Sequence, residues 1–191
     1  VVMAIRYGFK ISACINSQQV RGNHDFTGEI GHMRVPNSNR LCRCGKQGCF
    51  DTEVTYEAIC QKIEEGVRVG LFQHLATMIE ENGGHLSIDL FIKACNEGDK
   101  DALRLMRETA ETLCSAISWI YYMLDPAVLL INSRLGQYHG FYSLLSSLLY
   151  ELHENSFTYG KLVLKPAPYG EHLGAIGAAA YVYDHNFGQM D

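Results

Sequence analysis

The longest amphipathic stripe of the chain constrains the fold most, because it requires one long helix to lie against an apolar layer. From about Asp99 to Asp125-Pro126, apolar side chains recur every three or four positions, at Leu103, Met106, Ala110, Leu113, Ile117, Ile120 and Leu124. The next segment, AVLLIN at 127–132, is short and apolar up to its final Asn132, which is typical of a strand buried on both faces of a parallel sheet. The sequence therefore predicts a long helix packed on a sheet.

The rest of the second half continues this alternation of helix and strand. Residues 138–155 fit a helix, residues 161–166 (KLVLKP) fit a strand, and residues 172–185 fit a final helix rich in Gly and Ala. Such alternation favours an α/β fold with parallel strands.

The first half begins with short apolar segments separated by polar turns. From Thr55 the period becomes helical, and another helix is predicted between Ser87 as N-cap and Gly98. No Pro/Gly/Ser-rich linker divides the chain, so residues 1–191 are expected to form a single domain. The segments that predict a small antiparallel meander are 1–7 (VVMAIRY), 11–16 (ISACIN) and 32–36 (HMRVP).

Composition excludes some classes of partner. The chain has 191 residues, is 47% hydrophobic and carries a net charge of -5, so it has no basic excess with which to neutralise a phosphate backbone. No apolar run approaches the roughly 20 residues that span a bilayer, and no signal peptide is evident, which favours a cytoplasmic location. The opening VVMAIRYGFK has neither an initiator Met nor a polar leader, and we expect a fragment whose N-terminal part is missing.

Seven cysteines are too scattered to suggest a disulfide framework. Four of them lie far apart within apolar patterns and are predicted to be reduced core thiols, namely Cys14, Cys60, Cys95 and Cys114.

The other three cysteines are concentrated in one turn-rich loop, GEIGHMRVPNSNRLCRCGKQGCFD at 28–51. Cys42, Cys44 and Cys49, with two glycines between them, can turn three sulfurs toward one point, as a tetrahedral Zn(II) site requires. His32, ten residues upstream, is the nearest candidate for a fourth ligand. A Cys3His set leaves no open position for water, so it predicts structural rather than hydrolytic zinc. The alternative is a surface loop whose thiols are incidental.

Glu29 lies three residues before His32 in the same loop. A carboxylate beside an imidazole can accept and donate hydrogen bonds to vicinal hydroxyls, which is the chemistry of sugar recognition. The alternative is a glutamate that caps the backbone N–H groups of the loop.

The segments GEIGHMRV and CRCGKQGCFD together resemble the paired signature of the ROK family, which is named for repressors, open reading frames and sugar kinases. That signature is Glu-x-Gly-His followed by Cys-x-Cys-Gly-x-x-Gly-Cys-x-Glu, and weaker resemblance runs from the opening strands to GAIGAAAYV. The resemblance implies an actin-like ATPase (ribonuclease H-like) fold, of which this chain would be mainly the C-terminal lobe. It also implies that His32 and the three cysteines bind zinc, while Glu29, His32 and Asp51 face sugar hydroxyls.

Departures from the family pattern favour a regulator over a kinase. We find no Asp-x-Gly-x-Thr phosphate loop and no catalytic aspartate motif in this chain, and Lys10, Ser12 and Asn132-Ser133 stand where kinases commonly have glycines. These side chains would obstruct the approach of nucleotide phosphates to the backbone. Asp51 is one methylene shorter than the family's usual glutamate, which puts its reach to a sugar hydroxyl in doubt.

The segment INSRL at 131–135 resembles xylose repressors of Gram-positive bacteria, in which a winged helix-turn-helix precedes the sugar-binding region. The resemblance thus predicts the sugar-binding and dimerisation region of a repressor that acts as a homodimer and contacts DNA only through an N-terminal helix-turn-helix absent from this chain. The alternative is the C-terminal lobe of a sugar kinase, so enzymatic activity stays open.

Overall fold

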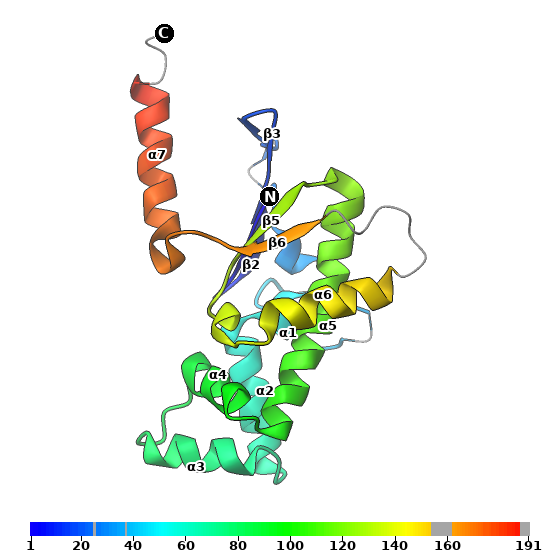
Figure 1. Cartoon of the computed structure of the whole chain (residues 1–191), viewed down its shortest axis with the longest axis vertical. Coiled ribbons are helices and arrows are strands. Elements are labelled where there is room, and N and C mark those ends of the chain that lie inside the picture. Colours follow the sequence, from blue (N-terminus) through cyan, green and yellow to red (C-terminus); the bar gives the residue numbers. More distant parts are fainter. Residues whose placement is uncertain (25, 37, 154–161, 188–191) are drawn as a thin grey trace.

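A computed structural model describes residues 1–24, 26–36, 38–153 and 162–187. Its main sheet has four strands in the order β2-β1-β5-β6, of which only β2 runs antiparallel to its neighbour. Helices flank this mixed sheet (Figure 1), as the alternation of helix and strand predicts. The strands are β1 (Val2–Ile5), β2 (Phe9–Ser12), β5 (Val128–Asn132) and β6 (Val163–Pro166).

The predicted antiparallel meander is only partly correct. The segment 11–16 is divided between β2 and a small hairpin, β3 (Cys14–Ile15) with β4 (Gln18–Gln19), which forms a separate sheet. The segment 32–36 is not a strand of either sheet. Its backbone instead pairs with the cysteine loop, since Val35 N donates to Gly48 O and Phe50 N donates to Met33 O.

The long helix α5 (Lys100–Leu124) confirms the predicted stripe. Asp99 caps it by accepting a hydrogen bond from Ala102 N, and Asp125, in the left-handed conformation, ends it before Pro126. The apolar stripe packs against α4 (Ile88–Asn96) and α6 (Phe141–Leu152). The largest fully buried side chains of the core include Phe9, Phe50, Phe91, Phe141, Met106, Leu113 and Ile117.

Two helices, α1 and α2, lead from the cysteine loop into this core. α1 (Asp51–Val54) follows the last loop cysteine directly, and α2 (Tyr56–Arg68) is capped by Thr55, as predicted. Ser87 caps α4 through Leu90 N, also as predicted. A helix that the sequence patterns did not indicate, α3 (Gln73–Glu81), lies between α2 and α4.

Helix ends in the second half differ modestly from expectation. The helix predicted over 138–155 begins only at Phe141, because residues 138–140 form a bend and a turn after the 3-10 turn η2 (Arg134–Gln137). Residues 154, 155 and 161 of the predicted elements lie outside the described residues. After a further 3-10 turn, η4 (Gly170–His172), the last described element is α7 (Leu173–Phe187).

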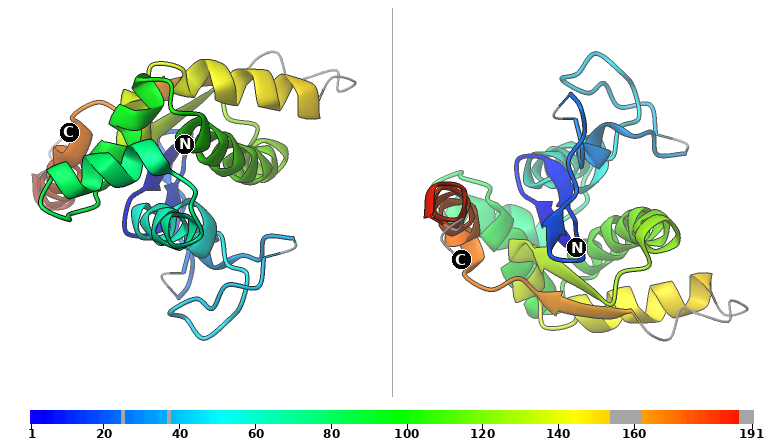
Figure 2. Two further views of the ribbon diagram at one scale, coloured as in Figure 1. Left: turned by 90° about the horizontal axis from the view of Figure 1, so that it is seen from below. Right: turned by 90° about the horizontal axis from the view of Figure 1, so that it is seen from above.

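α7 lies apart from the main core. Figures 1 and 2 show it on the side of the strands opposite to α5 and α6. Its apolar side chains Ile176, Tyr181 and Val182 are exposed. None of the described helices is long and apolar enough to cross a membrane.

The prediction that four scattered cysteines are core thiols is wrong for one of them. Cys95 and Cys114 are buried and Cys60 is half-buried, whereas Cys14 is exposed because it lies in the β3–β4 hairpin, outside the core. Every cysteine of the chain is a free thiol in the structure.

The packing of α5 predicts a position-dependent loss of stability. Leu113→Ala removes a fully buried side chain and is expected to lower the free energy of unfolding by about 2–5 kcal/mol. Met123→Ala, on the same helix but 77% exposed, is expected to cost less than about 0.5 kcal/mol. Urea unfolding followed by circular dichroism measures both, and equal losses would contradict this description of the core.

Candidate metal centre and ligand site

The cysteine loop is shaped by backbone pairing and by two glycines with positive φ. Cys42 N donates to Lys46 O and Gly45 N to Cys42 O, which closes a tight turn at Gly45 (φ +84°). Gly48 (φ +75°) has no room for a side chain, since a Cβ there would lie 2.4 Å from Ser38 O. The two glycines therefore allow the three thiols to face one point.

The four predicted metal ligands lie together. One ligand atom from each of His32, Cys42, Cys44 and Cys49 falls within 4.8 Å of all the others. His32 Nδ1 is 3.7 Å from Cys42 Sγ, and the sulfurs of Cys44 and Cys49 are 3.6 Å apart. A tetrahedral ion with bonds of about 2.0–2.3 Å would separate its ligands by about 3.5–3.8 Å. The cluster could therefore hold a metal ion.

The chemistry of the thiols also suits a cation. Burial, followed by contact with the sulfurs of Cys44 and Cys42, raises the pKa of Cys49 to about 12. The backbone N–H of Lys46 lowers the pKa of the exposed Cys44 thiol. Thiolate sulfurs this close would repel one another, and a bound cation would offset that repulsion.

Polar contacts fasten the loop to the helices behind it. Ser38 Oγ donates to Glu53 on α1, and the Glu53 carboxylate lies 2.6 Å from Lys62 Nζ on α2. Arg40 forms a bidentate pair with Glu65 at 3.0 and 2.5 Å, which lowers the pKa of the Glu65 carboxyl. These side-chain contacts therefore hold the loop against α1 and α2.

Asp51 does not lie open to solvent, although the resemblance implied a sugar contact there. Its side chain is only 10% exposed, and its Oδ1 accepts a 2.8 Å hydrogen bond from Phe9 N on β2. Gly31 packs against the same oxygen, where a Cβ would lie 2.1 Å away. Asp51 Oδ2 lies 3.9 Å from both His32 Nδ1 and Arg43 Nη2. Asp51 Oδ1 thus binds the backbone of β2, and Asp51 Oδ2 faces the cysteine loop.

Glu29 is partly exposed and is paired across the site. Its Oε1 lies 2.5 Å from Lys10 Nζ on β2. It makes no side-chain capping bond to the turn η1 (Ile30–His32) that follows it, so the alternative of a loop cap is not what the structure shows. Lys10 is 19 residues away from Glu29 in the chain, and no motif in the sequence predicts this ion pair.

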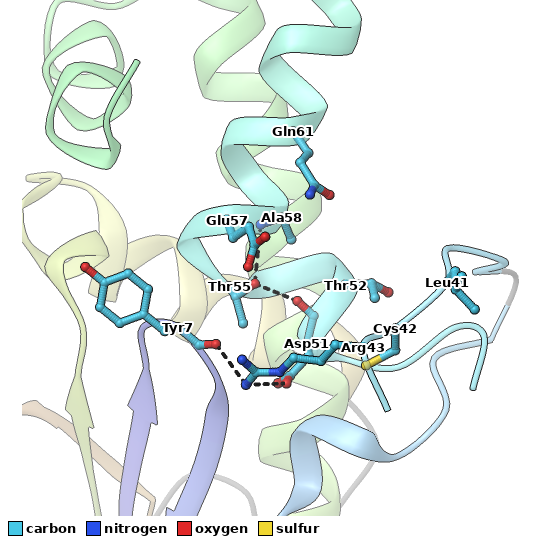
Figure 3. A pocket seen from close by; sticks show the side chains of 10 residues that line it. All are labelled: Tyr7, Leu41, Cys42, Arg43, Asp51, Thr52, Thr55, Glu57, Ala58 and Gln61. Atoms are coloured by element: carbon cyan, nitrogen blue, oxygen red, sulfur yellow. Dashed lines mark hydrogen bonds and ion pairs between the residues drawn. The ribbon is translucent and has the colours of Figure 1, made fainter. Parts of the chain in front are cut away.

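Beside Asp51 lies a pocket of about 130 Å³, between the loop, the β1–β2 turn and α2 (Figure 3). Arg43 crosses its mouth and donates to Tyr7 O at 3.2 Å. Thr52, Thr55 and Gln61 add polar groups to its wall. No periodicity or motif identifies Tyr7 as a wall residue of this pocket, because the β1–β2 turn brings it there.

The cluster geometry predicts cysteine-specific metal binding. Cys44→Ser is expected to weaken Zn(II) binding by at least about 10-fold, because it replaces one of four ligands in a closed set. Cys14→Ser is the matched control, since Cys14 is exposed and outside the cluster. Competition with a chromophoric chelator measures both affinities, and an equal affinity in the two variants would contradict the cluster as a metal site.

The chain is similar to several known proteins. The xylose repressor of Bacillus subtilis (strain 168) is 22% identical over 190 residues, covering 97% of this chain and 44% of that protein. Among solved structures, a ROK family transcriptional regulator, homolog of the E. coli MLC protein, is 23% identical with a TM-score of 0.74 and covers 87% of this chain and 41% of its own. A ROK family glucokinase from Streptomyces griseus, in complex with glucose and AMPPNP, is 18% identical with a TM-score of 0.81, covering 94% and 59%.

These structural likenesses concern the fold, and they confirm the predicted actin-like ATPase type. The chain spans less than half the length of the xylose repressors that it matches. The model of the ROK family matches residues 1–185, and the chain therefore belongs to the ROK family.

Proposed function

We propose that this chain is the sugar-binding and dimerisation region of a ROK-family transcriptional repressor of the xylose type. The observation that carries the proposal is the position of His32, whose Nδ1 lies 3.7 Å from a cluster sulfur and 3.9 Å from the Asp51 carboxylate. If Nδ1 binds the metal, Nε2 is left to hydrogen-bond a ligand hydroxyl. Glu29 would accept from a second hydroxyl, while Asp51 would position the site from behind.

We propose Zn(II) as the ion, bound by His32, Cys42, Cys44 and Cys49. Three thiolates and one imidazole suit zinc, and a closed set of four ligands gives the ion a structural role. It would hold the loop that carries His32 and fix the ring of that residue. Protein side chains, and not the ion, would then contact the sugar.

The end of β5 favours a regulator over a kinase. Arg134 N donates to the Tyr56 hydroxyl at 2.6 Å, and Leu135 N donates to Ser133 Oγ at 3.2 Å. Backbone N–H groups at such a strand end are the groups that cradle phosphates in nucleotide sites. In this chain the N–H groups of Arg134 and Leu135 are already hydrogen-bonded to side chains, which supports a strand end that binds no nucleotide phosphate.

The repressor would respond to sugar by a population shift. A sugar changes the balance between DNA-bound and released states only through its different affinity for the two. Contact with DNA would be made by a helix-turn-helix outside this chain, which the net charge of -5 supports. The protein would act as a homodimer.

The second candidate is the C-terminal lobe of a sugar kinase, favoured by the TM-score of 0.81 with the S. griseus glucokinase. Incubation of the full-length protein with ATP and a panel of hexoses and pentoses distinguishes the two functions. The repressor proposal predicts no sugar-dependent release of ADP. Steady phosphoryl transfer would overturn it.

The proposed sugar contact predicts a response defect for Glu29→Gln. Loss of a hydrogen bond to a charged acceptor costs about 1.5–3 kcal/mol, so the sugar concentration that releases operator DNA should rise by about 10- to 100-fold. Glu81→Gln, an exposed change at the end of α3, is the control. Fluorescence anisotropy of labelled operator with the full-length protein measures the response. An unchanged response in Glu29→Gln would contradict the assignment of Glu29.

A further inference from the structure

One of the three loop cysteines is open to solvent, and the other two are not. Cys42 and Cys49 are 4% and 1% exposed, whereas Cys44 is an exposed residue. The sulfurs of Cys44 and Cys49 nevertheless lie only 3.6 Å apart. The cluster therefore places a thiol that a small solute can reach directly against a thiol that the fold covers.

The exposed thiol lies where the backbone has room to move. Cys44 is at the tip of a tight turn, which is closed by hydrogen bonds from Cys42 N to Lys46 O and from Gly45 N to Cys42 O. A Cβ built at Gly45 would meet nothing within 4 Å, so the space beside the tip is open. A small displacement of Cys44 thus meets no packed neighbour on the Gly45 side.

The covered thiol is fixed in place. Cys49 forms an antiparallel bridge with Arg34, and its Sγ lies 3.7 Å from His32 O. A disulfide has an S–S bond of about 2.0 Å, so the sulfurs of Cys44 and Cys49 would have to approach by roughly 1.5 Å. Movement of Cys44 at the turn can supply this approach while Cys49 stays where it is.

The other cysteines do not combine exposure with a neighbouring sulfur in this way. Within the cluster, Cys42 is buried and faces His32, whose Nδ1 is 3.7 Å from its Sγ. Cys44 could serve only as a metal ligand, but that role requires no access to solvent, since Cys42 and Cys49 are ligands of the same predicted set and are buried. Outside the cluster, Cys95 and Cys114 are buried, Cys60 is half-buried, and Cys14 lies in the β3–β4 hairpin.

We propose that Cys44 and Cys49 are a redox modification site, which forms a reversible disulfide with hydrogen peroxide or another small hydroperoxide and so releases the metal from the loop. As a metal ligand, Cys44 is a thiolate, which is the nucleophilic form of the side chain. Loss of the metal would free the loop that carries His32 and weaken sugar binding. This inference rests on the proposed zinc site and names how that site is regulated.

The oxidation consists of two displacements. The Cys44 sulfur attacks one peroxide oxygen, the O–O bond breaks, and hydroxide leaves behind a sulfenic acid at Cys44. The Cys49 sulfur then attacks the Cys44 sulfur, so that the S–S bond forms, the S–O bond breaks and a second hydroxide leaves. The two thiolates lose two electrons to one peroxide, which becomes two waters after taking up two protons. His32 and Cys42 remain as two ligands of the four that zinc requires.

The test treats the full-length, zinc-loaded protein with hydrogen peroxide. A chromophoric chelator follows the release of zinc, and mass spectrometry of alkylated tryptic peptides identifies the disulfide. Trypsin cleaves after Arg40, Arg43 and Lys46, so the three loop cysteines fall in three different peptides. The expected cross-link joins peptide 44–46 to peptide 47–62, with about one zinc ion released for each disulfide. Fragmentation distinguishes Cys49 from Cys60, which shares its peptide.

A variant and a control locate the effect. Cys44→His keeps four ligands, as a Cys2His2 set that also suits zinc, but it cannot form the disulfide. Peroxide is expected to release zinc from it about 10-fold or more slowly than from the unmodified protein. Cys14→Ser is the matched control, since Cys14 is an exposed thiol outside the cluster, and it should release zinc at the original rate. If Cys44→His takes up no zinc, the cross-linked peptide in the unmodified protein decides.

Calorimetry then compares sugar binding before and after oxidation, with whichever of xylose, glucose and N-acetylglucosamine binds the reduced protein most tightly. Its affinity is expected to fall by about 10-fold or more and to return after treatment with dithiothreitol and zinc.

The outcomes separate this inference from the proposed function. Zinc that stays bound in peroxide, a cross-link through Cys42 instead of Cys44, or equally fast release from Cys44→His would overturn the redox site and leave the zinc site and sugar binding in place. A reduced protein that binds no zinc would overturn the zinc site and the redox site together. Failure of every sugar to bind the reduced, zinc-loaded protein would overturn the proposed function, while zinc release and the cross-link would still decide on the redox site.

Discussion

The buried hydrogen bond from Phe9 N to the Asp51 carboxylate joins the two halves of the site. Phe9 belongs to the edge strand β2, and Asp51 begins the helix that follows the last metal-loop cysteine. A hydrogen bond to a carboxylate with little access to water is worth about 1.5–3 kcal/mol. Gly31 must be a glycine because this carboxylate fills the place of its side chain. The sheet edge, the His32 turn and the cysteine loop thus meet at one acceptor.

Aromatic packing supports the same junction. The rings of Phe9 and Phe50 meet edge to face with their centroids 5.8 Å apart. The rings of Phe50 and Trp119, on α5, do the same with centroids 5.5 Å apart. The residue before Asp51 is therefore anchored in the main core, and the cysteine loop ends at that anchor. These ring contacts and the Arg40–Glu65 pair hold the proposed ligand site firmly against the core.

Charge in the site is arranged in pairs. Glu29 faces Lys10, and Asp51 faces Arg43 and His32, so donors and acceptors alternate around Gly8. The proposed polyhydroxylated ligand would need such alternation of donors and acceptors. Asp51 is one methylene shorter than the family's usual residue, and its Oδ1 accepts the hydrogen bond from Phe9 N on β2.

Local signals in the sequence explain what could be predicted. α5 was predictable because its stripe, its cap at Asp99 and its stop at Pro126 are all adjacent in the chain. α3 was missed because its N-terminus has no local cap. Phe72 N is instead bound by Asp101, 29 residues away.

The site divides in the same way between local and distant signals. The four candidate ligands were grouped by spacing and by resemblance, and the structure brings them together. The inward turn of Asp51 and the Lys10–Glu29 pair depend on β2 lying beside the loop. No spacing along the chain encodes that adjacency.

The central claim is that a metal-ordered loop holds Asp51 against β2 and so shapes the ligand site. Hydrogen exchange of the Phe9 amide, measured by NMR with and without a zinc chelator, tests it most directly. The account predicts that metal removal speeds exchange at Phe9 by about 10-fold or more, while the Leu113 amide in the middle of α5 is unchanged. Unchanged exchange at Phe9 after complete loss of the metal would contradict it.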